Sequence, residues 1–163
     1  SKIASIYEGT NGIQAMDLLG RKMRAQKGMV FMKWLQGANK EISAAKACSA
    51  TAEIAGEVEK AVGHLGATAM HLSQLAMGGK LEEAMVQATP YLNLFGAVAL
   101  GIHSLEQAVV AQQAIDAGST DAFYKGKILN ARYYVANHLP QAVALAKSIK
   151  AGDDSCLDEI LFA

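Results

Sequence analysis

The sequence has little proline, little cysteine, few aromatic residues and no excess of either charge. Its 163 residues include 2 prolines and 2 cysteines, and 15 Lys and Arg balance 15 Asp and Glu. A neutral chain lacks the basic surface that nucleic acids and acidic membranes attract, so we expect neither as a main partner. Cys48 and Cys156 are isolated thiols, which excludes a disulfide framework. No metal ligand lies at a suitable spacing beside either, so no metal site is predicted.

Several sequence signals are also missing. No segment carries the uninterrupted run of about 18 apolar residues that indicates a membrane span. No basic stretch followed by an apolar one indicates a secretory signal, so we expect the bacterial cytoplasm or a compartment like the mitochondrial matrix. Residues 78–80 and 126–127 contain Gly-Lys pairs but lack the spacing of a phosphate-binding loop. No stretch alternates with period two, so no sheet is expected.

What the sequence does contain is helix-forming residues in helical register. Hydrophobic residues make up 52% of the chain, enough for a sizeable core. Thr10 or Asn11 is a suitable N-cap for a first amphipathic helix that reaches Met23. A second apolar pattern begins after Gly28 and reaches about Cys48, with a possible interruption at residues 37–39.

Three more helices follow from the same spacing. The third has the apolar stripe Ile54, Val58, Ala61, Leu65, Ala69, Leu72 and Ala76, and ends at Gly78-Gly79. The fourth begins near Leu81; Pro90 either kinks it or starts a new helix with Thr89 as N-cap. Ser119 or Thr120 caps the fifth, which Pro140 should kink and whose inward stripe is Ile128, Val135, Leu139, Ala142, Ala146 and Ile149. The short connections predict an all-α fold, an up-and-down bundle of four to five long antiparallel helices.

Few residues in these helices suggest chemistry. His64 and His71 share a helix face, but their seven-residue spacing does not suit a metal site. The methionines are interpreted as core filling. Phe123, Tyr124 and the run 132–134 form the main aromatic cluster, for which packing between helices is favoured over a binding role, with a hydroxyl reaching water or a partner.

The first residues are more specific. Residues Tyr7 to Gln14 read Tyr-Glu-Gly-Thr-Asn-Gly-Ile-Gln. By itself, Glu8 would be interpreted as a loop acid that favours the positive end of the following helix. The string, however, resembles the C-terminal signature of the acyl-CoA dehydrogenases: Tyr-Glu-Gly-Thr, two variable residues, then Ile-Gln. Residues 88–96, 123–125 and 131–134 resemble the extra helical domain of the branch that contains methylmercaptopropionyl-CoA dehydrogenase-like enzymes.

The resemblance implies a function for the parent protein. Members of this family use FAD to oxidise an acyl-CoA thioester to the trans-2-enoyl-CoA and pass electrons to an electron-transfer flavoprotein. The carboxylate at the position of Glu8 removes the α-proton while a hydride goes to the flavin. The family pattern also assigns Tyr7 and Gly9 to the substrate side. It assigns cofactor contacts to Thr10, Asn11, Gly12 and Gln14, near a helix N-terminus that can meet phosphate or ribose oxygens.

Some choices stay open at this stage. In some relatives the catalytic glutamate lies on an earlier helix, which makes an upstream residue the alternative to Glu8. We expect residues 1–26 to be the end of the dehydrogenase core and residues 27–163 to be a separate helical bundle domain. The isolated chain should be inert, since most of the flavin and substrate domains are missing from it. The second hypothesis is a structural module that covers the core or mediates homo-oligomer formation.

Overall fold

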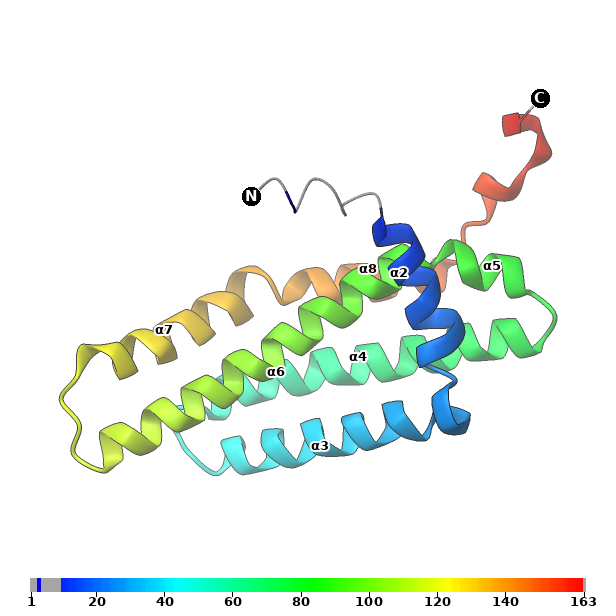
Figure 1. Cartoon of the computed structure of the whole chain (residues 1–163). Coiled ribbons are helices and arrows are strands. Elements are labelled where there is room, and N and C mark those ends of the chain that lie inside the picture. The colour runs from blue at the N-terminus through cyan, green and yellow to red at the C-terminus, as the bar shows by residue number, and fades with distance from the viewer. Residues whose placement is uncertain (1–2, 4–9, 163) are drawn as a thin grey trace.

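The computed structural model describes residue 3 and residues 10–162, and its regular elements there are all helical. Three long helices, α3 (Met29–Lys46), α4 (Ala52–Met77) and α6 (Ala88–Asp116), alternate in direction. A fourth rod consists of α7 (Ala122–Asn137) followed by α8 (Pro140–Ala151) (Figure 1). The short helix α5 (Leu81–Val86) joins α4 to α6. The predicted all-α up-and-down bundle is confirmed.

The helix α6 lies at the centre of the bundle. It packs on α3, α4, α7 and α8, so a broad face of the helix is buried, while a stripe that includes Asn93, Leu100 and Val110 stays exposed. Its length and hydropathy would also allow it to cross a membrane, as judged on the described residues, but a central core helix passes the same test. The buried side chains along it are Tyr91, Leu94, Val98, Ile102, Leu105, Ala108 and Ala111.

The apolar stripes predicted for the third and fifth helices face this core. Ile54, Val58, Ala61, Leu65 and Leu72 of α4 are buried, while Ala69 and Ala76 are partly buried against the same cluster. The stripe of the fifth predicted helix is entirely buried across α7 and α8. The interruption considered at residues 37–39 does not occur, because α3 continues through them. The interpretation of the methionines as core filling is wrong for most of them, because five are at least half exposed: Met16, Met29, Met32, Met70 and Met77.

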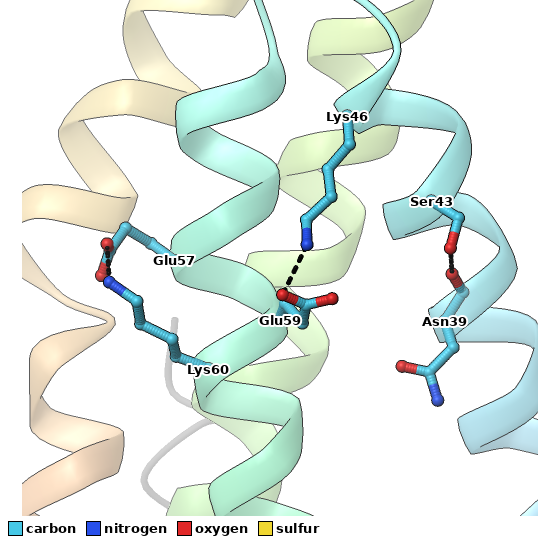
Figure 2. Close-up of polar contacts among 6 residues, drawn as sticks. All are labelled: Asn39, Ser43, Lys46, Glu57, Glu59 and Lys60. Atoms are coloured by element: carbon cyan, nitrogen blue, oxygen red, sulfur yellow. Dashed lines mark hydrogen bonds and ion pairs between the residues drawn. The ribbon is translucent and has the colours of Figure 1, made fainter.

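The α3–α4 connection is closed by a buried side chain. Thr51 is fully buried, and its hydroxyl donates to the Ala45 carbonyl oxygen at 2.7 Å, which satisfies a carbonyl at the end of α3. Nearer the surface, Lys46 Nζ of α3 lies 2.6 Å from Glu59 Oε2 of α4, as Figure 2 shows. The same view shows contacts within one helix, such as Ser43 Oγ donating to the Asn39 carbonyl oxygen at 2.8 Å. The α3–α4 hairpin is therefore tied by local polar contacts as well as by its core.

Both prolines lie where a new helix begins. Pro90 is the third residue of α6, where backbone amides have no acceptor inside the helix. The predicted new helix is therefore correct, but its N-cap position is Gln87, not Thr89. Pro140 is the first residue of α8, so the chain breaks there instead of only bending.

The cap predicted for the fifth helix was also wrong. Asp121 precedes α7, and its carboxylate accepts a hydrogen bond from the Phe123 amide at 2.9 Å. Ser119 and Thr120, the predicted caps, lie in the connection before it. Asp121 has the extended backbone (ψ 123°) that an N-cap requires, so conformation decided between neighbouring residues with similar capping ability.

Helices α6 and α8 meet closely at Gly101. This residue is buried, and a Cβ added to it would lie 3.1 Å from Leu139 Cδ1 and 3.7 Å from Val58 Cγ2. Gly96, on the same helix, has no heavy atom within 4 Å of the equivalent position. Only the first glycine is therefore required by packing within this chain.

The first helical segment crosses the end of the bundle. Helix α2 (Asn11–Asp17) continues into a π-helical turn (Leu18–Lys22), and both contact α6. Gln26, Lys27 and Gly28 then have φ values of 49°, 58° and 84°, which reverse the chain into α3. This turn lies at the predicted 26/27 domain boundary. The division into two domains stays a prediction.

The final residues leave the bundle. Gly152, with φ 69°, ends α8, and two short turns follow at Ser155–Leu157 and Glu159–Phe162. Figure 1 shows this segment projecting away from the helices, and each side chain from 153 to 161 is exposed.

Candidate functional site

The predicted site residues fall at the beginning of the chain. Tyr7, Glu8 and Gly9 lie outside the described residues. Thr10 takes the N-cap position of α2, as predicted, but its side chain makes no capping hydrogen bond, and Asn11, Gly12 and Gln14 are in the first turn of α2. Thr10 is half-buried, whereas Asn11, Gly12 and Gln14 are exposed. The predicted cofactor contacts are thus brought together at one helix end, and three of them face outward.

Helix α2 is held on the bundle by a few contacts. Ala15 is fully buried, and Leu18 and Leu19 pack against the core cluster. The Tyr91 hydroxyl of α6 donates to Met23 Sδ at 3.4 Å, and burial raises the pKa of this phenol. These contacts fix the position of the helix end that carries the predicted cofactor residues.

An exposed ion pair joins Asp17, the last residue of α2, to Arg21 in the π-helical turn that follows. Arg21 Nη2 donates to Asp17 Oδ2 at 2.8 Å, and Arg21 Nε bonds the other carboxylate oxygen. Hydrogen bonding to Arg21, with a smaller contribution from Lys22, lowers the pKa of Asp17. The acidic residue precedes the basic one by four positions, which is the favourable order in a helix, so the pair stabilises the last turn of α2.

The first turn of α2 suits an anionic, oxygen-rich ligand. Amide and hydroxyl side chains at Asn11, Gln14 and Thr10 can bond phosphate and ribose oxygens. A Cβ at Gly12 would meet no heavy atom of the described chain within 4 Å, so nothing there obstructs the approach of another molecule. The residues present therefore fit the edge of a dinucleotide such as FAD.

The bundle itself offers no metal-binding cluster. Among the described residues, no group of three or more His, Cys, Asp or Glu side chains is placed to hold a metal ion. His64 and His71 are both half-buried on α4, and His71 Nε2 has no hydrogen-bond partner within the described part of the chain. Cys48 and Cys156 are free thiols.

A trough lies on the bundle surface between α6 and α7. It has two adjoining hollows, of about 270 and 460 Å³, that share Gln107 and Lys127 in their walls. Lys127 Nζ donates to Gln107 Oε1 at 2.9 Å and lies 5.3 Å from the centre of the Phe123 ring. Phe123 is 59% exposed and Val110 is 61% exposed. The trough therefore combines apolar surface with a cation.

The aromatic cluster predicted around the trough has two parts. Tyr134 is half-buried, and its hydroxyl donates to the Ala97 carbonyl oxygen of α6 at 2.9 Å. It therefore packs between helices as predicted, although its hydroxyl turns inward rather than toward water. Tyr133 and Phe123 stay exposed. Sequence reasoning missed the trough because Gln107 and Val110 come from α6, and no sequence spacing aligns them with α7.

The comparisons with known proteins cover nearly the whole chain. Residues 33–159 match the family described as acetyl-CoA dehydrogenase C-terminal like. A butyryl-CoA dehydrogenase of Syntrophomonas wolfei is 31% identical over 96% of this chain and 26% of its own length. A broad-specificity linear acyl-CoA dehydrogenase of Mycobacterium tuberculosis is 29% identical over 99% of this chain and 28% of its own length.

A third relative belongs to the branch suggested by the sequence. The 3-methylmercaptopropionyl-CoA dehydrogenase of Ruegeria pomeroyi is 31% identical over 96% of this chain and 27% of its own length. The chain thus spans about a quarter of the length of the curated relatives that it matches. With the family match over most of the bundle, the chain belongs to the C-terminal domain of the acyl-CoA dehydrogenase family.

Proposed function

We propose that the whole protein is an FAD-dependent acyl-CoA dehydrogenase that converts an acyl-CoA to the trans-2-enoyl-CoA. The main support is the similarity of this chain, over 96% of its length, to proteins named butyryl-CoA and 3-methylmercaptopropionyl-CoA dehydrogenase. An electron-transfer flavoprotein is the proposed electron acceptor. This chain contributes the end of the site and the helical bundle after it.

The roles of individual residues follow the family pattern. Glu8 is proposed to take the α-proton, with Tyr7 and Gly9 beside the acyl thioester. Bound FAD would supply the hydride acceptor. Thr10, Asn11, Gly12 and Gln14 are proposed to hold its polar part at the first turn of α2, where the exposed side chains and the open space at Gly12 support this placement. Water exclusion around Glu8 would strengthen it as a base.

The test of Glu8 is the Glu8→Gln variant in the whole protein. Removing the base should slow flavin reduction by acyl-CoA about 10²–10⁴-fold, while the flavin absorbance spectrum of the purified protein stays unchanged. Glu41→Gln, an exposed carboxylate on α3, is the matched control and should keep full activity. Full turnover in Glu8→Gln would transfer the base role to an upstream glutamate.

The isolated chain is proposed to be inert. It carries only one edge of the flavin site, so the purified 163-residue chain should show no flavin absorbance and no dehydrogenase activity. A yellow preparation with stoichiometric flavin would contradict this part of the proposal.

The second proposal concerns the bundle, which we assign a structural role in covering the core and in homo-oligomer formation. It is supported by the lack of a metal-binding cluster among the described residues and by exposed apolar side chains on α2 and α3, including Ile13, Met16 and Met32. Deleting residues 27–163 from the whole protein should disrupt assembly, measured by light scattering. If assembly and stability were intact while acyl-CoA preference changed, a role in the substrate site would replace it.

A further inference from the structure

The C-terminal tail, residues 153–161, carries three apolar side chains that its own bundle does not cover. Leu157, Ile160 and Leu161 are 39%, 75% and 63% exposed. Leu157 ends the first short turn, and Ile160 and Leu161 lie in the second. The tail is nevertheless ordered by its own hydrogen bonds: Asp153 Oδ1 accepts from the Ser155 amide at 3.0 Å, and Asp158 Oδ1 accepts from the Ile160 amide at 3.0 Å.

The tail is also strongly acidic. Asp153, Asp154, Asp158 and Glu159 are its charged residues, and no basic residue follows Lys150. Helix α7 has the opposite composition, with Lys125, Lys127 and Arg132 and no acidic residue between Ala122 and Asn137. The chain is neutral as a whole, so this separation of charge is a property of the two surfaces.

The trough on α7 matches the tail in apolar surface as well as in charge. Its larger hollow, of about 460 Å³, has Phe123, Tyr124 and Val110 in its walls, with Lys127 beside them. The one acidic wall residue, Glu106, is engaged by His103 Nδ1 at 2.7 Å. An acidic peptide with three aliphatic side chains is the ligand chemistry that this surface would bind.

The tail cannot reach the larger hollow of the trough in its own chain. Helices α7 and α8 follow one another along the bundle (Figure 1), so Lys127 lies about 35 Å from the end of α8 at 1.5 Å per residue. The chain from Gly152 to Ile160 spans at most about 27 Å when fully extended, and its two turns shorten that span. Any contact between the tail and this larger hollow must therefore join two molecules.

From the complementary charge, the paired apolar surfaces and this limited reach, we propose that the C-terminal tail of one copy docks in the larger hollow of the α6–α7 trough of a second copy. A two-fold arrangement lets each copy donate a tail and receive one, so the contact closes on itself. This contact rests on the homo-oligomer formation proposed above and assigns a specific surface to it. It does not depend on the proposed dehydrogenase activity.

The test is sedimentation velocity on the 163-residue chain over a concentration series. The wild-type chain should form a reversible dimer that weakens as salt is raised, because salt screens the acidic tail from the basic helix. Ile160→Glu in the tail and Phe123→Glu in the trough should each weaken the dimer at least tenfold. Met70→Glu, which alters an equally exposed side chain on α4, should leave it unchanged.

Mixing the two weakened variants tests whether the contact forms between copies. The Ile160→Glu chain keeps an intact trough and the Phe123→Glu chain keeps an intact tail, so their mixture should recover a dimer with one contact. No recovery would overturn the proposal. A wild-type dimer that neither variant weakens would leave self-association standing but exclude the tail contact, and a wild-type chain that stays monomeric would exclude both.

Discussion

The bundle and the segment from residue 10 to residue 28 are held in different ways. The bundle surrounds α6 with helices on several sides, and its buried side chains form one continuous cluster. The segment has one fully buried side chain, Ala15, and a few partly buried ones on the edge of that cluster. Yet the proposed cofactor contacts lie in the segment, and the bundle has no metal-binding cluster in its described residues. Stability and proposed chemistry are thus separated along the chain.

The largest effect expected is from Leu105→Ala in the bundle. Leu105 is fully buried at the centre of α6, so its removal should lower the free energy of unfolding by about 2–5 kcal/mol. Leu100→Ala, on the same helix at 57% exposure, should change it by less than about 0.5 kcal/mol. Urea denaturation followed by circular dichroism measures both. Equal losses would mean that α6 is not the centre of the core.

A smaller loss is expected at the closest helix contact. Gly101→Val would push the side chains of Leu139 and Val58 away from α6. It should lower the free energy of unfolding by about 1–3 kcal/mol. Gly96→Val introduces the same side chain into open space on the same helix and should be neutral or slightly stabilising, since glycine is the poorer helix former. The difference between the two midpoints in thermal denaturation isolates packing from helix propensity. A smaller loss at Gly101 than at Gly96 would contradict this packing.

The segment should detach without unfolding the bundle. Ala15→Asp places a charge in a fully buried position, and releasing α2 costs less than burying that charge. Hydrogen exchange should therefore rise over residues 11–23 while α4 and α6 stay protected. Met16→Asp, at a 52% exposed neighbour, should leave exchange unchanged. Loss of protection throughout α6 would show that segment and bundle fold as one unit.

The smallest effect is expected in the turn between the two regions. Gln26 has a left-handed backbone, a conformation that costs a non-glycine residue about 1–2 kcal/mol. Gln26→Gly should therefore raise the free energy of unfolding by up to about 1 kcal/mol. Gln36→Gly, within α3, should lower it by about 1 kcal/mol. Parallel urea titrations measure the change in the free energy of unfolding for both variants. A decrease for Gln26→Gly as well as for Gln36→Gly would show that the backbone of this turn is not strained.

The sequence predicted the repeating parts of the structure better than the singular ones. The stripe from Ile54 to Leu72 is buried because helical spacing alone decides which side faces the core. The caps were harder, because Ser119, Thr120 and Asp121 have similar capping ability and only the backbone selects one of them. The left-handed Gln26 and Lys27 have no sequence signal, since glycine and asparagine are the usual residues there.

The candidate site was predicted to a similar extent. Thr10, Asn11, Gly12 and Gln14 lie together because they fall within five residues at the start of α2, which spacing alone ensures. The roles of Tyr7, Glu8 and Gly9 stay predictions. The trough was missed because it joins residues of α6 and α7 that are distant in sequence, and the contiguous acidic tail was missed because charge was not compared between segments. A charge count over single helices, with α7 basic and residues 153–163 acidic, would have been the available signal.

The high hydropathy of α6 also constrains the order of synthesis and folding. Outside the bundle, its 29 residues would expose an aggregation-prone segment with the hydropathy of a membrane span. During translation α3 and α4 emerge first, and their short connection, closed by Thr51, lets them pair locally. When α6 leaves the ribosome, an apolar surface is therefore already present to receive it. A circular permutation that placed α6 ahead of α3 would remove this protection and should increase aggregation during expression, even where the finished fold is unchanged.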